Sequence, residues 1–366
     1  MGQVAVPAAF WRGGTSRAVL FKQDDLARFD TRQRDRIVLA ALGSPDPGGR
    51  QVDGLGGGIS SLSKVCILDS TGDEVTFTFG QVDVLQPVVD WTGTCGNMSA
   101  AVGPFAIEAG WIPPRAPLTE VPVLATNVQK RYIAQVPTPD GELSLDGDYA
   151  IGGVPGTAAR IGLKWLDPSG TQGRGPLPTG QPCQRVDGLD VSIVDVANPF
   201  VFLRASDVGL TGSETPLEIE SDPEVMARLE SIRAAAAHLI GLAGLQAIPK
   251  VAILAPAANG VDIVARAVSM QRIHRTFPAT GAMCLAAAVV LPGTIAHEIA
   301  KSSDVVERTV RIGHPAGVIE IGVELERRSG EWVVCSASTS RTARKIMDGQ
   351  VYVPSGYLAD HAWFDR

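Results

Sequence analysis

Cys95 is the residue whose surroundings point most clearly to chemistry. It opens an alanine-rich segment that predicts a helix, and Gly96 and Asn97 follow it directly. A thiol at a helix start lies near the positive end of the helix dipole, which favours the thiolate. The free N–H groups of the first turn can also hold a carboxylate or enolate oxygen. The alternative is a small buried hydrophobic residue, which is our interpretation of the other cysteines, Cys66, Cys183, Cys284 and Cys335.

Lys64 is the second candidate for chemistry. It starts an apolar, strand-like run directly after Ser63. Burial would lower its pKa and allow it to act as a base. The glycine-rich loop of residues 53–62 is flexible enough to close over a ligand, but it lacks the sequence context of a phosphate loop. A lysine at a strand start is commonly solvated, so both interpretations stay open from the residues alone.

Polar residues in three other segments could contact a carboxylate. In residues 12–16, two glycines allow the backbone to approach a ligand and two hydroxyls follow, although an ordinary hairpin turn explains the glycines equally well. His274 and Arg275 precede a second predicted helix start, but such a pair is common on a surface. Asn198 stands before a proline, where a turn between strands would account for it.

The two halves of the chain resemble each other. Residues 63–68 and 249–254 are similar runs, and each leads into an alternating segment typical of a half-buried strand. An alanine-rich helix then opens at Cys95 in the first half and at Thr280 in the second, at nearly the same spacing. We therefore predict a duplicated α+β unit in which strands surround one apolar helix.

The repeat also suggests domain boundaries. We expect a first domain over residues 1–185 and a second over residues 186–335, with a C-terminal segment, residues 336–366, that could pack back on the first domain. Residues 221–245 predict a further helix inserted in the second unit, with Ser221 and Asp222 as caps and Pro223 in the first turn.

Composition excludes several classes of protein. The 366 residues are 45% hydrophobic and 19% charged, which is typical of a globular chain. A net charge of −7 disfavours nucleic acid as a partner, and it means that an anionic substrate needs a local positive pocket. The five cysteines are an odd number without CxxC spacing, which favours reduced thiols in the cytoplasm. We see no transmembrane run, no signal peptide and no metal or redox-cofactor motif, so we expect no cofactor and no membrane partner.

Several motifs together resemble the PrpF family. They are WRGGTSR at residues 11–17, GSPD at 43–46, DGLGG at 53–57, SKV at 63–65, DWTGTCGN at 90–97, ANP at 197–199, TGA at 280–282 and GHPAG at 313–317. The resemblance implies the fold of diaminopimelate epimerase. That fold is α+β and has two similar domains, each a mostly antiparallel sheet wrapped around a central helix, with the active site in the cleft between them.

The resemblance also implies an activity and its residues. The family includes 2-methylaconitate cis-trans isomerases, aconitate and methylitaconate Δ-isomerases and oxalomesaconate tautomerases. Lys64 and Cys95 fall on its acid/base pair. Residues 57–62 match neither the methylaconitate nor the oxalomesaconate branch closely, so the substrate stays open. Together with the segments above, the substrate-binding candidates are Arg12, Gly14, Thr15, Ser16, Ser63, Gly96, Asn97, Asn198, His274, Thr280, Gly281 and Ala282.

We therefore expect a cofactor-independent isomerase of a small unsaturated di- or tricarboxylate, and we leave open a homodimer. Our assignment is a neutral Lys64 as base and a protonated Cys95 as acid, and the reverse order stays open. A two-thiol racemase is an alternative, but it would need a cysteine where Thr280 stands, and Cys284 lies one turn further along. A non-catalytic carboxylate-binding accessory protein is the other alternative.

Overall fold

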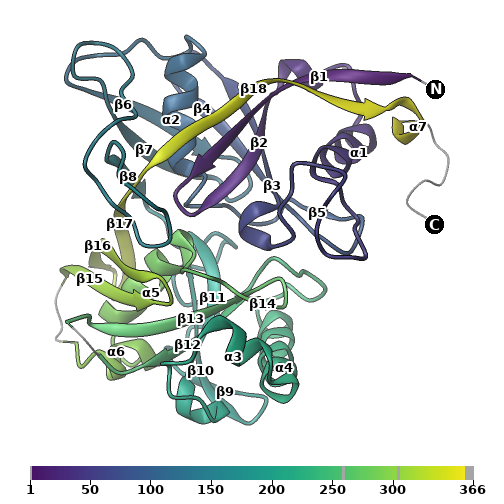
Figure 1. The fold of residues 1–366 in the computed structure, drawn as a ribbon. Helices are drawn as coiled ribbons and strands as arrows, with labels where there is room; N and C mark the ends of the chain where they lie inside the picture. Colours follow the sequence, from purple (N-terminus) through teal and green to yellow (C-terminus); the bar gives the residue numbers. More distant parts are fainter. Residues whose placement is uncertain (1, 258–259, 303–305, 359–366) are drawn as a thin grey trace.

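The computed structural model describes residues 2–257, 260–302 and 306–358. Figure 1 shows two lobes, one for each half of the chain. The first lobe contains β1 (Gln3–Gly13), β2 (Ser16–Lys22), η1 (Asp24–Leu26), α1 (Thr31–Leu42), η2 (Ser60–Leu62), β3 (Lys64–Ser70), β4 (Val75–Val82), β5 (Val89–Asp90), α2 (Ser99–Glu108), β6 (Leu118–Ala125), β7 (Lys130–Pro137) and β8 (Ile161–Leu166).

The second lobe repeats this order and adds short elements of its own. Its elements are β9 (Gln184–Val186), β10 (Leu189–Val196), β11 (Asn198–Arg204), η3 (Ala205–Val208), α3 (Pro216–Glu220), α4 (Pro223–Leu239), β12 (Lys250–Ala255), β13 (Ile263–Ser269), β14 (Arg272–Ile273), α5 (Ala279–Val290), α6 (Ile295–Ile299), β15 (Glu307–His314), β16 (Gly317–Arg328) and β17 (Glu331–Arg341). The chain ends with β18 (Ala343–Pro354) and α7 (Ser355–Leu358).

The strand pairings follow one pattern in both lobes. In the first, β2 is parallel to β3, β3 antiparallel to β4, β4 parallel to β6, and β6 antiparallel to β7. In the second, β11, β12, β13, β15 and β16 pair in the same senses and the same order. The lobes are joined by the pairing of β8 with β17 and by β18, which pairs along β1 (Figure 1). The predicted α+β class and its duplicated unit are therefore confirmed.

One apolar helix lies inside each sheet. All twelve residues of α5 are buried, and so is every residue of α2 except the last, Glu108. A helix that is apolar on every side can be stable in water only when other elements cover it completely. The curled sheets supply this cover, and both helices consequently start deep in the molecule.

Helix α4 begins as predicted but ends earlier, and it is not an insertion in the repeat, because it stands between β11 and β12 as α1 stands between β2 and β3. The Asp222 side chain accepts hydrogen bonds from the N–H groups of Glu224 and Val225, which caps the start. The helix stops at Leu239 instead of continuing to residue 245, because Gly241 takes a positive φ of 78° and Leu242 N–H turns back to the Ala237 carbonyl.

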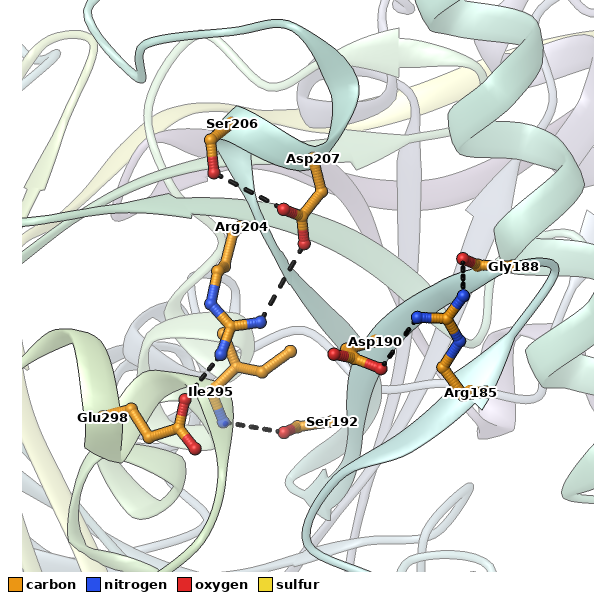
Figure 2. A network of polar contacts seen from close by, with 9 residues as sticks. All are labelled: Arg185, Gly188, Asp190, Ser192, Arg204, Ser206, Asp207, Ile295 and Glu298. Carbon is orange, nitrogen blue, oxygen red and sulfur yellow. Dashed lines mark hydrogen bonds and ion pairs between the residues drawn. The ribbon is translucent and has the colours of Figure 1, made fainter.

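Polar contacts hold the outer elements of the second lobe on its sheet (Figure 2). Ser192 of β10 accepts a 2.9 Å hydrogen bond from Ile295 N–H at the start of α6. Arg204 at the end of β11 donates to Glu298 of α6 and lies 3.9 Å from Asp207. These contacts fix α6 against the strands that also carry Asn198.

Candidate active site

The start of α2 is built around Cys95. The regular helix begins at Ser99, four residues later than the expected start at Cys95, because a turn over residues 96–98 comes first. Met98 is the N-cap, and Cys95 lies one turn before it, where its carbonyl accepts the N–H of Ser99 at 3.0 Å. The N–H groups of Gly96, Asn97 and Met98 precede this first helical bond and have no acceptor within the helix.

The start of α5 faces the start of α2. The first helical bond of α5 runs from Ala282 N–H to the Pro278 carbonyl at 2.8 Å, so the N–H of Ala282 is occupied while those of Thr280 and Gly281 precede it. A β-carbon placed on Gly96 would lie 3.0 Å from the Thr280 nitrogen. Two helix N-termini with positive dipole ends thus converge, which is a favourable place for an anion.

Contacts from the second lobe hold the Cys95 loop. Asn198 of β11 accepts from Thr94 N–H at 3.1 Å and donates to the Thr94 carbonyl at 2.8 Å and to Thr280 Oγ1 at 3.2 Å. Asp90 accepts from Ala247 N–H at 3.1 Å. Asn198 therefore links the two helix starts, and the position of the Cys95 loop depends on how the lobes are packed.

Lys64 begins β3 and is only 7% exposed. Its Nζ donates to Oε1 of Gln81, the residue opposite on β4, at 2.6 Å. Gln81 is fixed in this orientation because its Nε2 donates to the carbonyls of Ser60 and Ser63 at 3.0 Å each. Burial lowers the pKa of Lys64, and Cys95 is near enough to act electrostatically in the opposite direction. Lys64 is thus held as a candidate base beside Cys95.

A second lysine, Lys250, occupies the matching position in the second lobe. It begins β12 and pairs with Phe200 of β11, and its Nζ donates to the Ala247 carbonyl at 2.8 Å. Burial and the neighbouring Lys64 lower the pKa of Lys250 to about 8, against the opposing effects of Cys95 and Asp90. The repeat at residues 249–254 aligned Lys250 with Lys64 in the sequence, but it did not indicate that the two ammonium groups lie near each other.

Of the other buried thiols, Cys66 lies two residues after Lys64 on β3 and is near enough to Lys64 and Cys95 to act electrostatically, whereas Cys284 lies in the second lobe. Cys284 is in the middle of α5, is 0% exposed, and donates its Sγ–H to the Val194 carbonyl at 3.2 Å. Burial raises the pKa of Cys284 and of Cys66 well above the ordinary value. Thr280, and not a cysteine, stands at the start of the second helix.

His274 is a neutral hydrogen-bond donor. The backbone N–H of Thr276 donates to His274 Nδ1 at 3.2 Å, so the ring proton must be on Nε2. Burial lowers the pKa of His274 to about 3, and Lys64 and Lys250 add to this effect. Near the two lysines, the ring therefore presents an N–H and no charge at neutral pH.

The turn between β1 and β2 lies next to the α2 start. Thr15 Oγ1 accepts from Asn97 Nδ2 at 3.2 Å and shares a 3.0 Å hydrogen bond with Thr276 of the second lobe. Gly14 has φ 49°, and a β-carbon there would meet Asn97 Oδ1 at 2.2 Å, so only glycine fits. The buried hydroxyl of Ser16 has no partner among the described residues, which leaves it available to a ligand.

Two of the sequence candidates are engaged in holding loops. Arg12 Nη1 donates to the carbonyls of Gly14 at 3.0 Å and of Thr342 at 2.9 Å, which ties the turn to the residue between β17 and β18. Ser63 is fully buried, and its Oγ accepts from Gln51 Nε2 at 2.6 Å, which folds the glycine-rich loop against β3. Arg12 and Ser63 therefore hold the β1–β2 turn and the glycine-rich loop in place through these hydrogen bonds.

A cavity of about 820 Å³ opens between the lobes beside Lys64. Gln81, Asp90 and Thr92 line it from the first lobe, and Gln246 and Arg272 from the second. Gln81 is the direct partner of Lys64, so this cleft approaches the candidate base from the side of Gln81. Lys64, Cys95 and Thr280 are not among the residues that line it.

Neither a metal cluster nor a membrane helix is present in the part of the chain that the structure describes. Within residues 2–257, 260–302 and 306–358, no three His, Cys, Asp or Glu side chains form a group that could hold a metal ion. None of the described helices is long and apolar enough to cross a membrane.

Comparison with known proteins identifies the family. The family model described as PrpF protein matches residues 3–354. The chain belongs to the PrpF family. It is 36% identical to a 2-methyl-aconitate isomerase of Shewanella oneidensis, with 96% of this chain and 98% of that protein covered. It is 37% identical to a (4E)-oxalomesaconate Delta-isomerase of Novosphingobium sp., with 95% and 98% covered.

A solved structure agrees with this assignment. The crystal structure of a methylitaconate-delta-isomerase is 38% identical and covers 99% of both chains, with a TM-score of 0.74. This PrpF-family chain therefore has the predicted diaminopimelate epimerase-like fold and is an isomerase, which confirms the predicted family, fold and enzyme class.

Gln81 is a candidate positioning residue that sequence analysis missed. Gln81→Leu would remove the acceptor that stabilises the Lys64 ammonium, and it should lower kcat about tenfold or more through lost orientation. The pKa of Lys64 should fall further, so the rising limb of the kcat/KM–pH profile should move to lower pH. Gln135→Leu, a change on β7 where the glutamine contacts Glu120, is the matched control. An unchanged profile in Gln81→Leu would show that this hydrogen bond does not tune the base.

Proposed function

We propose that this enzyme moves a proton, and with it a double bond, within a small unsaturated di- or tricarboxylate, using Lys64 and Cys95. The observation that carries the proposal is the burial of Lys64 beside Cys95 without a carboxylate partner among the described residues, next to two converging helix N-termini. The relatives named above are similar over their whole lengths, and their names refer to unsaturated carboxylic acids.

The cationic character of the site supports an anionic substrate. The whole chain carries a net charge of −7. Lys64 and Lys250 nevertheless lie near each other: Lys64 lowers the pKa of Lys250, and both lysines lower the pKa of His274. Helix dipoles add positive potential at the same place. A substrate with two or three carboxylates would neutralise these groups when it binds, which compensates part of the cost of burying them.

The chemistry requires removal of a weakly acidic proton from a carbon next to an alkene or a carboxylate. Neutral Lys64 Nζ takes this proton and becomes an ammonium group, while the electron pair spreads over the substrate as a dienolate. The N–H groups of residues 96–98 and 279–281 stabilise the developing negative oxygen. Cys95 Sγ–H then gives a proton to a different carbon, the double bond shifts, and the thiolate and ammonium return to their starting forms by proton exchange.

Deuterium exchange provides the test of this function. The purified enzyme should introduce deuterium from D₂O into at least one of aconitate, 2-methylaconitate, methylitaconate and oxalomesaconate, together with a shift of its double bond. Proton and deuterium NMR of each acid incubated with the enzyme would follow both events. The proposal would be contradicted if none of these acids exchanged or isomerised with folded enzyme at millimolar concentrations.

A further inference from the structure

Arg341, the last residue of β17, is a buried cation that no described carboxylate pairs with. Its side chain is 6% exposed, and burial lowers the pKa of Arg341 to about 10. Tyr149 acts on it electrostatically in the opposite direction. An unpaired guanidinium in the interior is costly unless an anion joins it, so the position requires an explanation.

The hydrogen bonds of Arg341 lead to the catalytic region. Its Nε donates to Asn97 Oδ1 at 3.2 Å, and its Nη1 donates to the Ser340 carbonyl at 2.9 Å. Asn97 in turn donates to Thr15, which shares a hydrogen bond with Thr276. Two of the five N–H groups of the guanidinium therefore have recorded partners, and Arg341 is fixed relative to the turn that follows Cys95.

A second cavity, of about 240 Å³, lies at Arg341 and is separate from the cleft beside Gln81. Thr15, Thr276 and Tyr149 also line it. The Thr15 and Thr276 hydroxyls share a hydrogen bond, and Thr276 Oγ1 lies 3.1 Å from His274 Nδ1, so these hydroxyls must turn to donate to a bound anion. The cavity therefore combines one buried cation with neutral hydroxyl-bearing side chains, as a carboxylate subsite requires.

The other charged or titratable groups in the wall do not compete for this role. Arg311 lies 3.2 Å from Glu320, so these two opposite charges pair with each other. Burial, with Arg341 and Arg266 acting in the same direction, lowers the pKa of His314 to about 4, so the ring is neutral at pH 7. Arg341 is thus the cation in this wall that is free to bind an anion.

We propose that this cavity is a carboxylate subsite of the active site, in which Arg341, Thr15 and Thr276 bind the substrate carboxylate that is not conjugated with the reacting carbons. This inference rests on the proposed function, because it assumes a substrate with at least two carboxylates. Arg341 takes no part in proton transfer and acts by anchoring the substrate, so it selects acids with a carboxylate at the required distance from the exchanging hydrogen.

Titration with an unreactive acid tests the subsite. Tricarballylate (propane-1,2,3-tricarboxylate) has no double bond, and calorimetry can measure its binding to the wild-type enzyme and to Arg341→Gln. Loss of a charged hydrogen-bonding partner should weaken binding about 10- to 100-fold. Arg344→Gln, a change of an exposed arginine three residues further on, should bind like the wild type. Turnover of the reactive acid by Arg341→Gln should show a raised KM with kcat changed less than about fivefold.

Stability separates a binding role from a structural one. Removing an unpaired buried charge should leave the Tm of ligand-free Arg341→Gln unchanged or raise it, whereas a structural role would lower it. Binding of tricarballylate by Arg341→Gln within twofold of wild type would overturn the proposal. If the variant does not fold, the structure of wild-type enzyme with tricarballylate decides. A carboxylate within hydrogen-bond distance of Arg341 supports the subsite, and a ligand with every carboxylate elsewhere overturns it.

The two proposals can fail separately. Tricarballylate binding reports on Arg341 without any turnover, while the D₂O experiment reports on proton transfer without any substitution at Arg341. Absence of exchange with all four acids would overturn the proposed function, and normal exchange together with unchanged tricarballylate binding by Arg341→Gln would overturn only the subsite.

Discussion

Lys64→Ala is expected to lower kcat by about 10²–10⁴-fold, because a positioned general base typically contributes this much. Binding of an unreactive acid should stay within about tenfold of wild type, since the helix-start N–H groups and Lys250 remain. Steady-state kinetics of the isomerisation would give the first number, and calorimetry with tricarballylate the second.

Two further lysine variants make this result specific. Lys64→Arg keeps the positive charge but cannot act as a base near neutral pH, so it should be as inactive as the alanine variant. Lys164→Ala removes an exposed lysine from β8 of the same lobe and should leave kcat unchanged. Near-normal turnover by Lys64→Arg would mean that Lys64 contributes only charge, and the base would have to be another group.

Cys95→Ser is expected to have a similarly large effect, lowering kcat by about 10²–10⁴-fold. The contact with the start of α2 is retained in this variant, because the backbone carbonyl of residue 95 and not the thiol accepts the Ser99 N–H. The fold should therefore survive while proton donation is impaired, since a serine hydroxyl is a much weaker acid than a thiol. Kinetics together with a thermal melt would separate these two effects.

Cys284→Ser is the matched thiol control. Cys284 is buried within α5 and bonds to the Val194 carbonyl, a contact that a hydroxyl can also make. Its kcat should be close to wild type. The opposite pattern, with Cys284→Ser inactive and Cys95→Ser active, would favour a two-thiol racemase over the proposed isomerase.

The central helices and the repeat could be predicted from the sequence because their signals are local. Residues 279–290 contain no charged side chain, which predicts a helix enclosed on all sides. The similarity of residues 63–68 and 249–254 predicts two equivalent strands, and β3 and β12 hold equivalent places in their lobes. The motif DWTGTCGN placed Cys95 at a helix start, although the regular helix begins four residues later.

The surroundings of these residues could not be predicted, because they depend on contacts between distant segments. Gln81 lies opposite Lys64 because of the register of the β3–β4 hairpin. The alternation of apolar and polar residues in β4 indicates which side chains are buried, but it does not indicate this partner. Arg341 reaches Asn97 from 244 residues away in the chain, so no local pattern connects them. Lys250 was aligned with Lys64, but the effect of Lys64 on the pKa of Lys250, and of both lysines on the pKa of His274, requires that the lobes pack face to face.

The measurement that tests the central claim most directly is hydrogen exchange by the two catalytic variants in D₂O, followed by NMR of the unreacted substrate. If Lys64 is the base and Cys95 the acid, Cys95→Ser should still exchange the acidic hydrogen of the substrate for deuterium without forming product, because its base is intact. Lys64→Ala should exchange nothing. Exchange by Lys64→Ala together with none by Cys95→Ser would contradict this account and assign the base to the Cys95 thiolate.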